Sequence, residues 1–234
     1  MTGAGTPALR ILVVTNMFPT SARPYFGIFV ARQADALRRL GVDVTVETIA
    51  GARGEQDYFL ARPRIRRAIA RVQPHVVHYH YGYTALAAPR SGPPMVLTLC
   101  GDDLNGASNG RGGITLKSRL GVVVTHLGTR GAARVIVKSE AMRLRLGAAA
   151  RARSELLPNG VSTTLFHPAS RAAARQRLGL APDALVLAFV NSIGQPTKRL
   201  DLAEATRDVL VGRGVAAQLL VAERVAPEEI ADYY

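Results

Sequence analysis

The sequence predicts an α/β fold in which a Rossmann-like parallel sheet domain is followed by an incomplete second Rossmann-like domain. Short apolar runs alternate with segments of helical periodicity, and strands separated by helices pair in parallel. The alternation stops around Asn159-Gly160 and Pro168 and then starts again. Two clear strands follow before the sequence ends, fewer than a stable open sheet needs. We therefore predict one domain over residues 1–168 and the start of another over 169–234.

The first domain opens with an apolar, β-branched run over residues 9–15, which predicts a strand. After a proline-containing loop, apolar residues recur on one face over 26–40, and Gly41 follows where a helix C-cap is expected. Valines alternate with polar residues over 42–47, a pattern typical of a half-covered strand.

The remaining elements of this domain follow the same alternation. We expect a basic helix over 62–73, strands over 75–79, 95–99, 134–138 and 154–157, and a helix capped by Ser139. The β-branched run at 122–124 fits either a helix or a strand. In the second domain we expect a helix over 171–178, a strand over 185–190, a helix opening at Lys198, a strand over 217–221 and a helix from Pro227.

Composition bounds the cellular context. The chain has 234 residues, 48% of them hydrophobic, and no apolar run approaches the roughly 20 residues that span a bilayer. Residues 1–8 lack the features of a signal peptide. Cys100 is the single cysteine, which excludes an internal disulfide and fits a reducing compartment. We predict a cytoplasmic protein.

The formal net charge is +13, and lysine stands only at Lys117, Lys138 and Lys198. Such a charge attracts polyanions, whether nucleic acid, anionic membrane or phosphorylated substrate. An arginine bias beside abundant Ala, Gly and Val is equally what a GC-rich genome produces by codon usage. No basic stretch interleaved with aromatics appears, so we do not expect nucleic acid as a partner.

The cations Lys198 and Arg199 open a helix directly beyond a strand. Unpaired N–H groups and the helix dipole favour a phosphate or diphosphate at such a place. The alternative is a pair of solvated charges. The dipole disfavours cations at a helix N-terminus unless an anion joins them, which weakens that alternative.

Asp102 and Asp103 follow a strand in a glycine-containing loop, at the edge where α/β sheets bind ligands. A carboxylate there can orient an acceptor hydroxyl or take its proton. We assign the orienting role to Asp102. The alternative is turn chemistry in a surface loop. Gly27, which follows a strand and loop, lets a ligand approach the backbone or simply makes a turn.

His78 and His80 are spaced to share one face of a strand. A zinc site needs at least one further ligand, and no cysteine pair supplies it, so we expect no metal. His80 is nearer the carboxyl end and is the expected cleft residue, whereas His78 fits the sheet interior. The basic helix over 62–73 either lies on an anionic membrane or packs its apolar stripe on the sheet, and we favour packing.

Four patches in this order resemble the family-4 glycosyltransferases of the GT-B fold. Any one patch alone is weak, but four in register over most of the chain are fairly specific. They are residues 16–19 with 24–30 and Gln33, 75–80 with 97–104, 157–161 with 166–168, and 198–202.

The resemblance implies a retaining, metal-independent transferase with a cleft between two domains and a nucleotide-sugar donor as co-substrate, without another cofactor. The implied acceptor is an unidentified glycan or lipid-linked molecule, which would suit peripheral contact with the inner face of the membrane. The resemblance also favours a ligand-binding role for Gly27 over a role in a turn. The implied residues are Asp102 as the catalytic group, Gly27, Asn159, Gly160, Lys198 and Arg199 toward the donor, and His80, Gly101 and Asp103 toward the acceptor.

The chain departs from the family pattern in two respects. Cys100 stands where many relatives carry a histidine, and Ser192 and Gln195 occupy the loop where many have an arginine. The family's Glu-x7-Glu motif, which grips the nucleotide-sugar, would lie beyond Tyr234, so we expect a truncated chain of weak activity. The alternatives are a non-catalytic remnant that binds an acceptor or partner, and a polyanion-binding protein driven by charge.

Overall fold

The computed structural model describes residues 8–50, 55–107, 113–190, 198–223, 225–226 and 228–234. The chain divides into two compact units. The first comprises Met1–Ala107 and Ile114–Gly160, and the second comprises Ser108–Gly113 and Val161–Tyr234.

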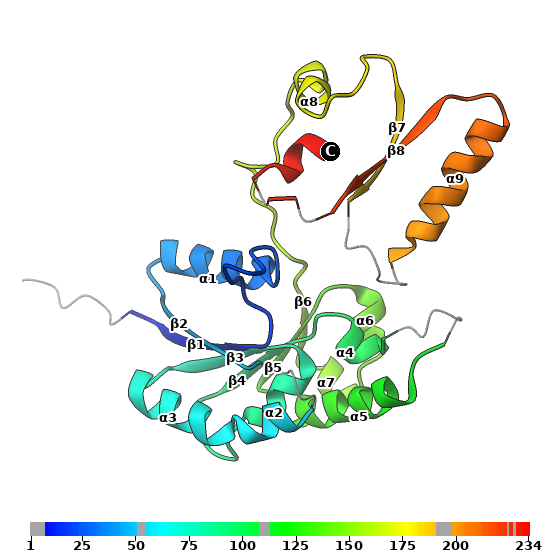
Figure 1. Cartoon of the computed structure of the whole chain (residues 1–234). Coiled ribbons are helices and arrows are strands. Elements are labelled where there is room, and N and C mark those ends of the chain that lie inside the picture. The colour runs from blue at the N-terminus through cyan, green and yellow to red at the C-terminus, as the bar shows by residue number, and fades with distance from the viewer. Residues whose placement is uncertain (1–7, 51–54, 108–112, 191–197, 224, 227) are drawn as a thin grey trace, which may run out of the picture. The chain divides into compact units, whose positions relative to one another are not determined.

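The first unit is built on a six-stranded sheet in which every pairing is parallel (Figure 1). The strand order is β2-β1-β3-β4-β5-β6. The strands are β1 (Arg10–Thr15), β2 (Asp43–Thr48), β3 (Val76–His80), β4 (Met95–Thr98), β5 (Arg134–Val137) and β6 (Ser154–Leu156). The prediction of a parallel, Rossmann-like sheet is confirmed.

Helices cover both faces of this sheet. Figure 1 shows α1 on one side and α2, α3 and α5 on the other. The helical elements of this unit are α1 (Ile28–Arg39), α2 (Glu55–Leu60), α3 (Arg62–Val72), η1 (Gly82–Ala87), α4 (Asp102–Asn105), α5 (Leu116–Gly131), α6 (Glu140–Leu144) and α7 (Ala148–Arg151). As predicted, Ser139 caps α6, because its Oγ accepts a hydrogen bond from the N–H of Met142 at 3.3 Å.

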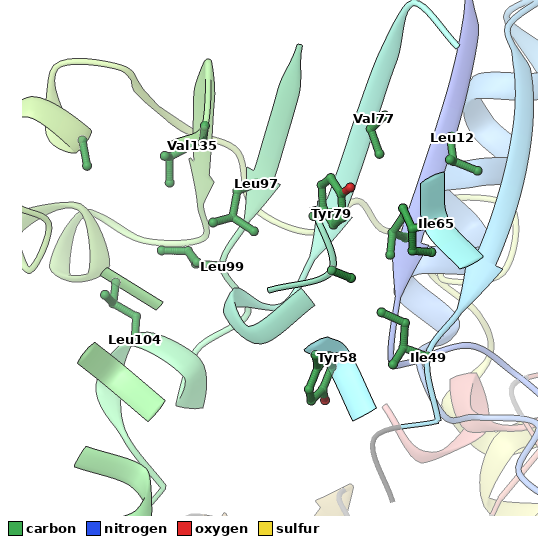
Figure 2. Packing of buried hydrophobic residues seen from close by; sticks show 14 of the residues in the cluster. Leu12, Ile49, Tyr58, Ile65, Val77, Tyr79, Leu97, Leu99, Leu104 and Val135 are labelled. Atoms are coloured by element: carbon green, nitrogen blue, oxygen red, sulfur yellow. The ribbon is translucent and has the colours of Figure 1, made fainter. Parts of the chain in front are cut away.

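The larger apolar core lies on the face of the sheet opposite α1, where the strands pack against helices such as α2 and α3 (Figure 2). Alternate residues of a strand point to opposite faces, so Leu12 joins this core while Val13 packs with Val30 of α1. Tyr79 and Leu97, from neighbouring strands, are almost completely buried in the larger core. This packing fixes the strand ends where the candidate site lies.

The basic helix α3 packs its apolar stripe on the sheet. Ile65 is 0% exposed and Ala68 is 2% exposed, while Arg66 and Arg67 face solvent. The favoured interpretation of this helix is therefore confirmed, since a stripe buried in the core cannot also enter a membrane.

The ambiguous run at 122–124 belongs to the sixteen-residue helix α5. Thr115 caps this helix by accepting a hydrogen bond from the N–H of Ser118 at 3.2 Å. The described residues form no helix with the length and apolar character needed to cross a bilayer.

In the second unit, the described residues form two parallel strands, β7 (Leu185–Val190) and β8 (Ala217–Ala222). Two helices accompany them, α8 (Arg171–Arg177) and α9 (Leu200–Gly212). The helix expected from Pro227 begins outside the described residues, and the described end of the chain contains a short 3-10 helix, η3 (Ile230–Tyr233).

Candidate active site

The carboxyl ends of β3 and β4 bring two polar loops to one edge of the sheet. His80, the last residue of β3, pairs in register with Thr98, the last residue of β4. The segments that follow these strands begin at Tyr81 and Leu99, so both start at the same edge. Open α/β sheets bind ligands at this edge.

The Asp103 carboxylate ties these two loops together. The side chain is completely buried. Its oxygens accept four backbone N–H groups, those of Gly82 at 2.7 Å, Gly101 at 2.8 Å, Cys100 at 3.0 Å and Leu104 at 3.1 Å. Burial raises the pKa of Asp103, and the backbone N–H donors oppose that rise. The expectation that Asp103 faces an acceptor is corrected, because its carboxylate is enclosed and organises the loops.

Asp102, its neighbour, is exposed at the first position of α4. Gly101 precedes it with φ of 133°, a conformation that favours glycine, and an added Cβ would meet nothing within 4 Å. Gly101 is therefore explained by the turn that starts α4. Of the two adjacent carboxylates, only that of Asp102 is accessible to an acceptor.

Tyr81 is a feature that sequence reasoning missed. It has φ of 80°, which a bulky residue rarely adopts, and such strained positions cluster at functional sites. Its ring lies 5.1 Å from that of Tyr83, which lies 5.9 Å from Tyr58. Asn16 donates to the Tyr58 hydroxyl at 2.8 Å. Burial and the Asp103 charge raise the pKa of Tyr81, so its hydroxyl remains protonated.

His80 belongs to the protein interior. It is 1% exposed, and its ring lies 4.2 Å from that of His78, whose Nε2 is 2.7 Å from Thr98 Oγ1. Within the described residues, His80 Nδ1 has no hydrogen-bond partner. Burial, followed by the charges of His78 and Lys138, lowers the pKa of His80 well below its usual value. The expectation that His80 contacts an acceptor is corrected, because the ring is enclosed.

The described residues contain no group of three or more His, Cys, Asp or Glu side chains that could hold a metal ion. The surroundings of Cys100 disfavour its thiolate. Burial and the Asp103 charge raise the pKa of its thiol to about 12, so the thiolate is scarce at neutral pH.

Gly27 has a structural explanation. It has φ of 70° at the start of α1, and a Cβ there would overlap the Met17 carbonyl group and lie 2.7 Å from the Phe18 nitrogen. The turn interpretation therefore accounts for this glycine. The structure does not require a ligand to explain it.

We expect Gly27→Ala to lower the free energy of unfolding by about 3 kcal/mol, because the methyl group combines a left-handed backbone with overlap against rigid backbone atoms. Gly41 is the matched control, since it has φ of 82° but an added Cβ meets nothing within 4 Å. Gly41→Ala should cost only about 1 kcal/mol. Urea unfolding of both variants measures the difference, and equal losses would contradict the packing explanation.

The cationic start of α9 lies in the second unit. Arg199 has φ of 60° and precedes the helix, and its guanidinium bonds Asp201 of the first turn through Nε–Oδ1 and Nη2–Oδ2 contacts of 3.0 Å each. Within the described residues, exposed Lys198 has no carboxylate partner. The two cations predicted to bind phosphate therefore differ, because Arg199 already has a counter-ion in Asp201. The residues at 191–197, with Ser192 and Gln195, lie outside the described part.

Asn159 and Gly160 are exposed after β6, and Gly160 is the last residue of the first unit. An added Cβ on Gly160 would meet no described residue of the first unit within 4 Å, so packing within that unit does not explain the glycine.

Comparison with known proteins shows that this fold is similar to the folds of solved glycosyltransferases and UDP-GlcNAc 2-epimerases. Sucrose-phosphate synthase from Thermosynechococcus elongatus is similar over 97% of this chain and 73% of its own, with a TM-score of 0.66 and 15% identity. UDP-GlcNAc 2-epimerase from Neisseria meningitidis, bound to UDP-GlcNAc, gives a TM-score of 0.55 at 10% identity, covering 96% of this chain and 75% of its own.

The model of Glycosyltransferase Family 4 matches residues 26–165, and the chain belongs to this family. A D-inositol 3-phosphate glycosyltransferase from Actinosynnema mirum is 45% identical over 78 residues, or 32% of this chain and 18% of the relative. One from Geodermatophilus obscurus is 52% identical over 50 residues, or 21% of this chain and 11% of the relative. The matched segments thus span less than a fifth of each relative's length.

Proposed function

We propose that this chain forms part of a glycosyltransferase that moves a sugar from a nucleotide-sugar to a hydroxyl acceptor. The observation that carries the proposal is Lys198, a cation without a carboxylate partner in the described residues, at the start of α9 after β7. The family model matches residues 26–165 and does not reach Lys198, so the role of this position is part of the proposal. Structurally similar proteins include S. aureus MnaA in complex with UDP and an epimerase bound to UDP-GlcNAc, which supports a nucleotide-sugar as partner.

Transfer in this proposal depends on electrostatic stabilisation of the departing diphosphate. Lys198 Nζ and the first N–H groups of α9 would meet its developing negative charge. Arg199 would bind the diphosphate only if its guanidinium exchanged Asp201 for a phosphate group. Asn159 and Gly160 are proposed as further contacts to the donor. We propose a retaining reaction without a metal or a further cofactor.

On the acceptor side we propose Asp102 as the group that orients the acceptor hydroxyl. Its exposure and its place at the sheet's carboxyl edge support this choice over Asp103. We propose that the partly exposed ring of Tyr81, which follows β3 at the same edge of the sheet, packs against the C–H groups of a sugar or polyol. The acceptor is proposed to be a glycan or a lipid-linked molecule. We place the reaction in the cytoplasm, in keeping with the single Cys100.

Isothermal titration with uridine diphosphate tests the donor site. Lys198→Ala is expected to weaken binding by about tenfold, the effect of losing one charge-assisted phosphate contact. Arg213→Ala is the matched control, because it removes one positive charge from the opposite end of α9. It should leave affinity within about twofold.

Equal losses in the two variants would contradict a specific site at Lys198. Absence of nucleotide binding would favour a non-catalytic binding module. Tight, salt-sensitive association with random DNA that Lys198→Ala leaves unchanged would favour the polyanion-binding alternative.

A further inference from the structure

Helix α5 has an amphipathic pattern that is reversed relative to an ordinary surface helix. Its buried positions carry small or hydroxyl residues, namely Ser118, Gly121, Thr125 and Thr129. Its exposed positions carry the large apolar residues, namely Leu116 at 82%, Leu120 at 65%, Val123 at 54% and Leu127 at 52% exposed. A surface helix normally places its apolar stripe toward the core.

The buried face is small because α5 packs closely on η1. A Cβ on Gly121 would overlap the Tyr83 hydroxyl, and one on Gly128 would lie 2.8 Å from the Ala85 Cβ. A Cβ on Gly82 of η1 would likewise overlap Thr125. Among the described residues, the close packing of α5 on η1 does not use the exposed apolar side chains and gives no reason for them.

The exposed apolar residues form one continuous stripe. Their spacings of four, three and four residues place them above one another on a single helix face. Eleven residues separate the first from the last, which corresponds to a length of about 16 Å. Contiguous apolar surface of this kind marks an interaction site rather than ordinary surface.

The charge beside the stripe indicates which partner it meets. Helix α5 carries Lys117, Arg119 and Arg130 and contains no acidic residue. The whole chain has a formal charge of +13, so a second copy would bring like charge to the interface. An apolar stripe flanked by cations matches an anionic lipid surface, where apolar side chains enter the boundary and cations meet the headgroups.

We propose that the exposed face of α5 docks on an anionic membrane, with the helix lying in the plane of the interface. This inference does not depend on the transferase reaction. It places membrane contact on α5 rather than on α3, whose apolar residues Ile65 and Ala68 are buried.

Vesicle flotation tests the proposal with phosphatidylcholine vesicles made with and without phosphatidylglycerol. The chain should bind the anionic vesicles selectively, and Leu120→Ser/Leu127→Ser should weaken binding by at least about tenfold. The matched control is Leu202→Ser/Val209→Ser on α9, where the replaced side chains are 55% and 54% exposed. This control should bind as the unchanged chain does, and thermal melts check that both variants fold.

Unchanged binding by the α5 variant, or equal losses in the two variants, would overturn the proposal. So would equal binding to neutral and anionic vesicles. A lipid-independent dimer that the α5 variant abolishes would also overturn it and would assign the stripe to a second copy. Arg119→Gln/Arg130→Gln should weaken vesicle binding more than Arg171→Gln/Arg213→Gln, and the reverse order would contradict the orientation.

Discussion

Asp103→Ala is expected to lower the free energy of unfolding by about 4 kcal/mol, because it leaves buried backbone N–H groups without an acceptor. Those donors belong to Gly82, Cys100, Gly101 and Leu104, so the loss affects both loops at the sheet edge. Urea unfolding followed by circular dichroism measures the change.

Asp102 provides the control, because it is the adjacent carboxylate and is exposed. Asp102→Ala should change stability by no more than about 0.5 kcal/mol while reducing sugar transfer. Asp103→Asn should fall between the two in stability, because the amide retains one acceptor oxygen but turns N–H donors toward other donors. Similar stabilities of Asp102→Ala and Asp103→Ala would contradict the roles assigned here.

The second large effect is loss of stability in acid. Burial lowers the folded-state pKa of His78 to about 4, from the ordinary value of 6.5 expected in the unfolded chain. Between these values the unfolded chain binds a proton that the folded chain does not, so stability present above pH 6.5 is lost as the pH falls. His78 alone should cost about 3 kcal/mol by pH 4. His80 acts in the same direction, because its pKa is also lowered.

Urea unfolding at a series of pH values between neutrality and the acid limit tests this expectation. His78→Gln should flatten the pH dependence, because the replacement does not titrate. His167→Gln, which replaces an exposed histidine, is the matched control. A profile for the unchanged chain that is flat between pH 6.5 and 4 would contradict the buried, neutral state of the two rings.

Strand patterns predicted the first sheet well, because short apolar, β-branched runs such as those at β1 and β5 favour buried strands when helical segments separate them. The ambiguity at 122–124 in α5 has a physical cause. The apolar period of this helix faces solvent, whereas its buried face is made of Ser, Gly and Thr. Sequence periodicity assumes that apolar residues point inward, so it had no signal for a helix packed through small residues against η1.

The candidate site was only partly accessible from sequence. Strand periodicity correctly placed His78 and His80 on one face, but it could not reveal that the structure encloses both rings. Adjacent Asp102 and Asp103 look equivalent in sequence, and the turn at Gly101 determines which one is buried. The strain at Tyr81 lies in its backbone conformation, which the sequence does not reveal. The only indication in the sequence was a tyrosine directly after a predicted strand.

At the start of α9, sequence reasoning found both cations and favoured Lys198 over Arg199 for the diphosphate, but it did not identify the counter-ion of Arg199. Asp201 is only two residues from Arg199, and the left-handed conformation of Arg199 accompanies their ion pair. The distinction matters for function, because it leaves Lys198 as the cation without a carboxylate partner in the described residues.

We propose that the start of α9 holds the diphosphate of a nucleotide-sugar. A crystal structure of the chain with uridine diphosphate is the decisive experiment. Phosphate oxygens should lie within hydrogen-bonding distance of Lys198 Nζ and of the first N–H groups of α9. A nucleotide bound elsewhere, with Lys198 directed into solvent, would contradict it.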